Sequence, residues 1–164
     1  EMLQEWSAEQ IEHLLSRNAD EPHAKLLAEA IYERRDRIRT TTALAGAVRD
    51  AIAGMGKCDV ERAVDKALPR VFQAFRIAVN GELRVLDQLL EALPFVMTPC
   101  GRIAILTFHS GEDNRVERAF AEGLEHGFYR AVSTEPVRPS GEERYSNPRS
   151  QCARLRWAVM AGSP

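Results

Sequence analysis

Apolar residues recur every three or four positions over most of the first 93 residues, which is the spacing of amphipathic helices. The S-x-x-Q pattern of Ser7–Gln10 is typical of a helix-capping box. We therefore expect helices at Ala8–Leu15 and Asp20–Arg37, a third helix capped by Thr40–Thr42, a loop at Ala53–Asp59 and a short helix at Val60–Ala67. The amino-terminal part of the chain is thus predicted to be helical.

A longer helix is predicted from Pro69 to Leu93. Its apolar stripe, with residues three and four apart, comprises Phe72, Phe75, Val79, Leu83, Leu86 and Leu90. A polar stripe beside it comprises Gln73, Arg76, Asn80 and Asp87. On a largely buried helix such a stripe is either paired inside the protein or lines a site, and the alternative is the solvated edge of a core helix.

The pattern changes after Gly101. The continuous apolar run Ile103–Phe108 is typical of a strand that is covered on both faces. We then expect a helix at Glu112–Gly123, a strand at Phe128–Ser133, a long loop at Thr134–Gln151 and a last strand at Ala153–Met160. Helices followed by a β-α-β-β order indicate the α/β class.

Composition narrows the class of protein further. The chain has 164 residues, is 45% hydrophobic and carries a net charge of −2, so bulk electrostatics does not indicate a nucleic-acid binder. Three scattered cysteines without a Cys-x-x-Cys pair argue against a disulfide framework or zinc site and favour a reducing, cytoplasmic compartment. No apolar stretch approaches the roughly 20 residues of a membrane span. Because the chain begins at Glu1, we expect a fragment or a processed polypeptide.

Five residues with hydrogen-bonding or flexible character, His109–Asp113, join the predicted strand to the next helix. Open α/β sheets place their ligands at such carboxyl ends of strands, which makes His109, Glu112 and Asp113 the candidate catalytic residues. A purely structural interpretation stays open. Ser110 would then be the N-cap, and the acidic pair would stabilise the positive end of the helix dipole.

Three stretches together resemble one known family. They are RVFQAFRIAVNGEL (Arg70–Leu83), GRIAILTFHSGED (Gly101–Asp113) and NPRSQCARLR (Asn147–Arg156). In the same order and at similar spacing they resemble R-x-F-Q-A-L-R-I-A-V-N-D-E-L, G-G-R-L-x-V-I-S-F-H-S-L-E-D-R and N-P-R-S-R-S-A-K-L-R of the MraW-type methyltransferases. The resemblance implies an S-adenosylmethionine-dependent enzyme that modifies N4 of a cytidine in small-subunit ribosomal RNA.

The family's cofactor stretches, T-L-G-G-G-G-H and D-L-G-V-S-S, do not occur in this chain. The resemblance therefore implies a helical substrate-recognition subdomain (residues 1–68) followed by the carboxyl-terminal part of an incomplete Rossmann-like methyltransferase sheet (residues 69–164). We expect no S-adenosylmethionine binding by the chain alone. At the motif positions, Gly111, Asn114 and Gln151 replace Leu, Arg and Arg, so two positive charges are missing.

Contact with RNA requires cationic and polar groups that reach phosphates and bases. The candidates come from the polar stripe, the junction and two arginine clusters: Arg34, Arg35, Gln73, Arg76, Asn80, Ser110, Asn147, Arg149, Arg154 and Arg156. Each arginine cluster is equally compatible with a solvated face.

Two functions remain from the sequence, together with a structural alternative. The first is the substrate-side half of an RNA methyltransferase, which would act with a separate amino-terminal half on small-subunit rRNA or the ribosomal subunit. The second is a non-catalytic module that binds RNA or the ribosome. The third is a structural remnant that forms a homodimer through exposed sheet edges.

Overall fold

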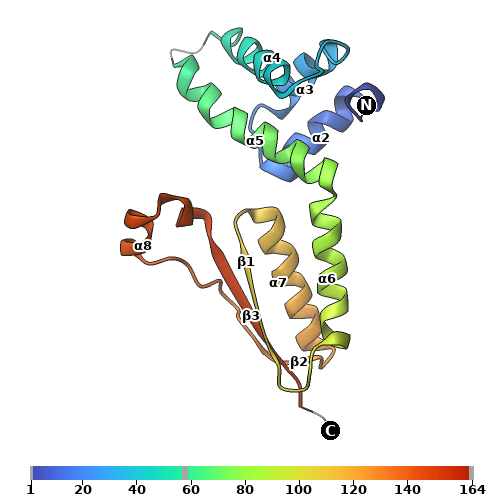
Figure 1. Cartoon of the computed structure of the whole chain (residues 1–164), viewed down its shortest axis with the longest axis vertical. Helices are drawn as coiled ribbons and strands as arrows, with labels where there is room; N and C mark the ends of the chain where they lie inside the picture. Colours follow the sequence, from blue (N-terminus) through green and yellow to red (C-terminus); the bar gives the residue numbers. More distant parts are fainter. Residues whose placement is uncertain (1, 57–58, 163–164) are drawn as a thin grey trace. The chain divides into compact units, whose positions relative to one another are not determined.

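The computed structural model describes residues 2–56 and 59–162, and it divides the chain into two compact units, Glu1–Gly81 and Glu82–Pro164. The first unit is helical, and the second combines helices with a three-stranded sheet (Figure 1). The expected α/β class is therefore confirmed. No helix among the described residues is long and apolar enough to cross a membrane.

The first unit consists of α1 (Met2–Glu5), α2 (Ala8–Ala19), α3 (Ala24–Glu33), α4 (Thr41–Ala53) and α5 (Val60–Asn80). The predicted capping box is present, because Ser7 Oγ accepts from the Gln10 N–H and the Gln10 side chain accepts from the Ser7 N–H. Thr40 caps α4 in the same way, with its Oγ1 3.1 Å from the Ala43 nitrogen. These caps satisfy amide groups that a helix leaves unpaired at its start.

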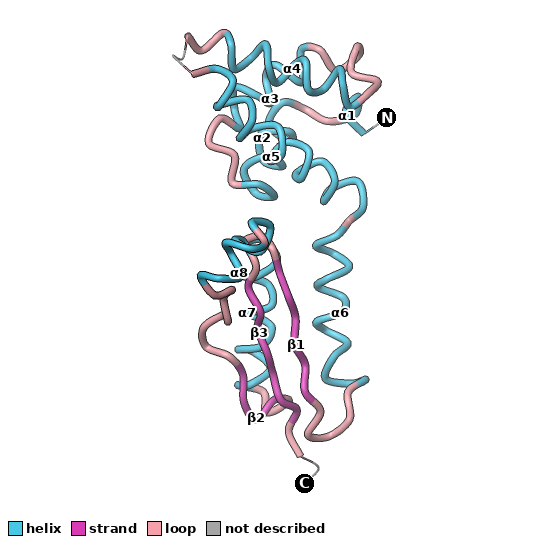
Figure 2. Tube along the Cα trace, turned by 60° about the vertical axis from the view of Figure 1, so that its left-hand side comes forward, coloured by secondary structure: helices cyan, strands magenta, loops and turns pink. Residues whose placement is uncertain are grey.

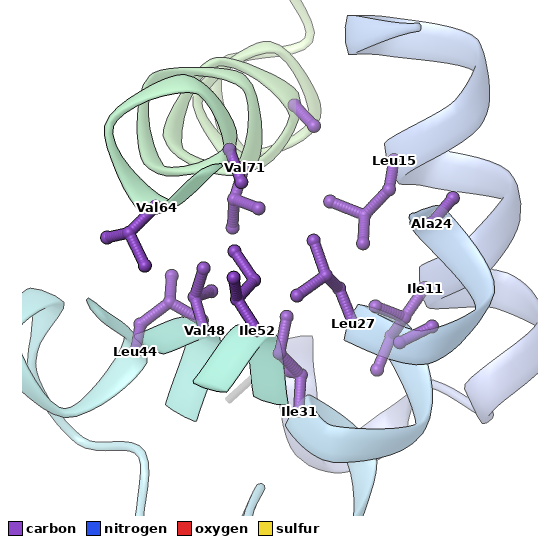
Figure 3. Packing of buried hydrophobic residues seen from close by; sticks show 13 residues of the cluster. Ile11, Leu15, Ala24, Leu27, Ile31, Leu44, Val48, Ile52, Val64 and Val71 are labelled. Atoms are coloured by element: carbon purple, nitrogen blue, oxygen red, sulfur yellow. The ribbon is translucent and has the colours of Figure 1, made fainter. Parts of the chain in front are cut away.

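Aliphatic side chains from four helices meet in the core of this unit (Figure 3). The labelled members are Ile11 and Leu15 of α2, Ala24, Leu27 and Ile31 of α3, Leu44, Val48 and Ile52 of α4, and Val64 and Val71 of α5. They recur three or four positions apart on each helix, as the sequence indicated. Burial of this stripe, at about 25 cal/mol per Å² of apolar surface, drives the helices together.

The predicted break at Pro69 was wrong, because α5 runs through Pro69 and ends at Asn80. Proline removes one helical hydrogen bond, but Ala67 and Val71 on either side are buried, and their packing keeps the helix continuous. The break comes at Gly81, whose φ of 62° is left-handed and suits glycine. The compact units consequently divide at Gly81. The assignment of residues 1–68 to substrate recognition stays a prediction.

The second unit begins with α6 (Glu82–Val96) and contains β1 (Arg102–Thr107), α7 (Ser110–Glu125), β2 (Tyr129–Val132), α8 (Gly141–Ser146), the 3₁₀ helix η1 (Pro148–Cys152) and β3 (Arg154–Met160). The strand order is β1-β3-β2, with both pairs antiparallel, so β3 lies in the middle (Figure 2). The stretch expected to be a loop, Thr134–Gln151, therefore includes two short helical segments.

The sheet buries one face against α7, and α6 packs on α7. Ile103, Tyr129 and Ala158 share a core with Val116 and Phe120 of α7. The expectation that the first strand is covered on both faces was wrong for the described residues. Residues of β1 alternate between buried and exposed positions, as in an antiparallel sheet with one covered face.

The opposite face, here called the outer sheet face, is apolar. By strand alternation and register it carries Ala104 and Leu106 of β1 and Leu155, Trp157 and Val159 of β3. Leu106 is 53% exposed and Trp157 is 38% exposed. Cys100 and Cys152 are free thiols, and the third cysteine, Cys58, lies outside the described residues.

Candidate functional site

The junction between β1 and α7 is organised by His109. Its backbone is extended (φ −141°, ψ 162°), and its Nδ1 accepts from the Glu112 N–H at 3.3 Å, so His109 is the N-cap of α7. The structure thus corrects the interpretation of Ser110 as the cap, because Ser110 is the first residue of the helix. An Nδ1 that accepts a hydrogen bond carries no proton, so the ring proton of neutral His109 resides on Nε2.

Glu112 closes the turn from the other side. Its Oε2 accepts from the Phe108 N–H at 2.9 Å, and its Oε1 lies 3.1 Å from His109 Nε2, although these two atoms are not aligned as a hydrogen bond. Burial tends to raise the pKa of Glu112, but interactions with the His109 side chain and the Phe108 N–H outweigh it and hold the pKa below its ordinary value. The carboxylate is therefore ionised at neutral pH.

Asp113 pairs with Arg156 of β3 through two parallel hydrogen bonds. Nε donates to Oδ1 at 2.8 Å and one terminal nitrogen donates to Oδ2 at 3.0 Å. Both residues are buried, and Arg154 approaches Oδ2 at 3.5 Å. The hydrogen bonds from Arg156 lower the pKa of Asp113 below its ordinary value, against the opposing effect of burial.

The three predicted catalytic residues therefore occupy one helical turn but differ in what they offer. Both oxygens of Asp113 are engaged, which suits it to hold α7 against β3. The Glu112 side chain is 25% exposed, so part of its carboxylate remains accessible as an acceptor. The geometry favours Glu112, held by His109, as the group that could orient a hydrogen-bond donor.

The second unit also holds four of the residues predicted to contact RNA. Asn147 and Arg149 are exposed, at the start of η1. Arg156 is only 3% exposed and bonded to Asp113, with Glu117 at 3.2 Å from one of its terminal nitrogens. Such placement favours a structural role for Arg156. Arg154 is half-buried, and its Nε has no hydrogen-bond partner among the described residues.

The remaining predicted RNA contacts of the first unit are partly engaged with the protein. Arg34 pairs with Asp50, and the Arg35 guanidinium lies 4.0 Å from the centre of the Tyr32 ring. Gln73 donates to the Asn18 carbonyl at 3.2 Å, which ties α5 to the end of α2. The exposed residues Arg76 and Asn80 also make interactions. The polar stripe is thus at least partly paired inside the protein.

Sequence reasoning did not single out Arg115, the residue that links α7 to α6. Its Nε lies 3.1 Å from Asp87 Oδ1 at the edge of an open cavity of about 500 Å³. The presence of Asp87 in the polar stripe was the available signal. Among residues 2–56 and 59–162, no three His, Cys, Asp or Glu side chains are grouped so that they could hold a metal ion.

Comparison with known proteins agrees with this architecture. The model of the MraW methylase family matches residues 1–161. Ribosomal RNA small subunit methyltransferase H 1 of Lachnoclostridium phytofermentans is 39% identical over 98% of this chain and 45% of its own length. Methyltransferase H 2 of Acholeplasma laidlawii is 42% identical over 96% of this chain and 46% of its own length. The chain thus spans about half the length of the relatives it matches, and it belongs to the MraW methylase family.

Proposed function

We propose that this chain is the substrate-side half of an S-adenosylmethionine-dependent methyltransferase that modifies N4 of a cytidine in small-subunit ribosomal RNA. The observation that carries the proposal is the family match over residues 1–161. Relatives at about 40% identity bear the name of ribosomal RNA small subunit methyltransferases, which supports an rRNA substrate.

The junction supplies chemistry that suits an amine acceptor. The cytosine amine is a weak nucleophile because its lone pair is delocalised into the ring, so it must be held in position for transfer. Glu112 is ionised and fixed by His109 and the Phe108 N–H, and it can accept a hydrogen bond from the amine or take its proton. Asp113 and Arg156 act as positioning residues, because their buried pair sets where α7 begins relative to β3.

The methyl donor itself does not fit this chain alone. The family's glycine-rich stretch is absent from the sequence, and the N–H groups at the start of α7 are engaged by His109 and neighbouring backbone rather than offered to a ligand. We therefore assign donor binding to a second, amino-terminal half. The relatives are about twice as long as the matched region, which leaves room for such a half.

The second half has a suitable surface to bind. Among the described residues, β1 pairs only with β3, so its other edge offers unpaired backbone groups. Leu106 and Trp157 on the outer sheet face are apolar and substantially exposed. An added strand on the β1 edge, together with a cover over the outer sheet face, would complete a methyltransferase sheet. A second copy of this chain is the rival occupant.

The test measures S-adenosylmethionine binding by calorimetry and methylation of small-subunit rRNA, using this chain alone and together with the amino-terminal half of a relative. We expect neither activity from the chain alone and both from the pair. Glu112→Gln should reduce methylation without changing assembly, and Leu106→Glu should reduce assembly. Micromolar donor binding by the chain alone would overturn the assignment of the donor site, and an inactive but assembled pair would overturn the enzymatic proposal.

A non-catalytic RNA- or ribosome-binding module is the second candidate. The missing positive charges at Asn114 and Gln151 favour it, because the family motif has arginine at both positions. This function would be supported if the assembled pair bound rRNA and the methyl donor but transferred no methyl group.

A further inference from the structure

An open pocket of about 620 Å³ lies in the first unit, away from every residue proposed above. Its charged and titratable lining comes from two segments: Glu21 and His23 before α3, and Asp59, Arg62, Lys66 and Arg70 at the start and along one side of α5. Three cations thus face one pocket in a chain whose net charge is −2.

The three cations form a regular row. Arg62, Lys66 and Arg70 are each four residues apart, so they follow one face of α5 with a rise of about 6 Å from one to the next. Asp59 is the N-cap of the helix, and its Oδ1 accepts from the Arg62 N–H at 3.1 Å. Its charge is therefore partly used at the helix terminus, and the row presents a net positive surface suited to phosphate.

Glu21 lies behind this row and is only 4% exposed. Its Oε1 accepts from the His23 N–H at 3.0 Å. Its Oε2 has no hydrogen-bond partner among the described residues, and the Arg70 guanidinium stands 3.7 Å away, beyond hydrogen-bond distance. A buried acceptor without a partner is costly, so a ligand that brings a donor to this oxygen would gain from satisfying it.

We propose that this pocket binds one ribonucleotide unit of an unpaired RNA strand, with its phosphate against Arg62 and Lys66 and its ribose hydroxyl donating to Glu21 as the Arg70 side chain moves aside. A ribonucleotide carries the two required features, an anionic group and a nearby hydroxyl donor. The 2′-hydroxyl is also the group that distinguishes RNA from DNA. The inference rests on the proposed RNA substrate and adds a contact that helps select it.

The experiment compares binding of a labelled 12-nucleotide single-stranded RNA and the DNA of the same sequence to the full chain, by fluorescence anisotropy at several salt concentrations. The test variant is Arg62→Gln/Lys66→Gln. The matched control is Arg17→Gln/Arg49→Gln, which removes the same charge from exposed positions outside the pocket. A third variant, Glu21→Ala, removes the acceptor, and circular dichroism verifies that each variant is folded.

The wild type should prefer RNA, and the test variant should bind it about tenfold more weakly, with a salt slope smaller by about two. The control should change little, and Glu21→Ala should abolish the preference for RNA over DNA. Equal RNA binding by wild type and test variant would overturn the pocket but leave the proposed function intact. Equal competition by inorganic phosphate and by a ribonucleoside monophosphate would reduce the pocket to a simple anion site. No RNA binding by the wild type, alone or with the amino-terminal half, would overturn both proposals.

Discussion

Removal of Asp113 should destabilise the second unit strongly, because it would leave the buried Arg156 without its main partner. The Arg156 side chain is only 4% exposed, and two of its nitrogens donate to Asp113 at 2.8 and 3.0 Å. Breaking a buried ion pair from one side typically costs 3–5 kcal/mol. Glu117 remains 3.2 Å from another Arg156 nitrogen, so we expect Asp113→Ala to lie at the low end, about 3 kcal/mol.

Replacement of both partners should cost much less than the sum of the single changes. In Asp113→Leu/Arg156→Met no charge of the pair is left buried, and apolar side chains of similar size fill the space. We therefore expect a favourable coupling energy of about 2 kcal/mol or more between the two positions in a double-mutant cycle.

Urea unfolding can follow this unit selectively, because the chain has two tryptophans, Trp6 in the first unit and Trp157 on β3. In a Trp6→Phe background, fluorescence reports on Trp157 alone, and circular dichroism reports on both units. A loss below about 1 kcal/mol for Asp113→Ala, or additive single changes, would refute the idea that the buried pair holds α7 on β3.

Two further predictions concern the same unit. Because the native pKa of Asp113 is depressed, its contribution to stability should be complete above the ordinary value of 3.8, decline as pH falls below it, and vanish below the native pKa; urea titrations at pH 2–6 should show this loss in wild type but not in Asp113→Asn. Gly123→Ala should lower the free energy of unfolding by about 1–3 kcal/mol in the same assay, because a Cβ would lie 2.3 Å from Cε2 of the buried Tyr129, and an unchanged midpoint would show that the ring relaxes freely.

Features encoded by neighbouring residues could be predicted from the sequence. The Ser7–Gln10 capping box and the Thr40 cap depend on side chains within three positions of their partners, so they were identified correctly. The last strand was also identified to within one residue, because its alternating pattern is local. The family resemblance, which rests on three separate motifs, was confirmed by the family match.

Features that depend on tertiary packing could not be predicted in the same way. Pro69 stops many helices, yet here the buried residues around it keep α5 intact, and Gly81 ends the helix instead. The bond between Asp113 and Arg156 joins positions 43 residues apart, and Arg156 alternated with apolar neighbours as an exposed strand residue would. Only the fold shows that its face of the strand is the buried one.

The two faces of β3 have separate tasks, which bears on how a divided enzyme could assemble. Arg156 and Ala158 point to the covered face, where Arg156 fixes the start of α7, whereas Leu155 and Trp157 lie on the outer sheet face. A partner that docks on the outer sheet face would therefore leave the Asp113–Arg156 pair undisturbed. The His109–Glu112 turn is held by contacts within the second unit alone, so the proposed acceptor for the substrate amine is formed before any donor-binding half arrives.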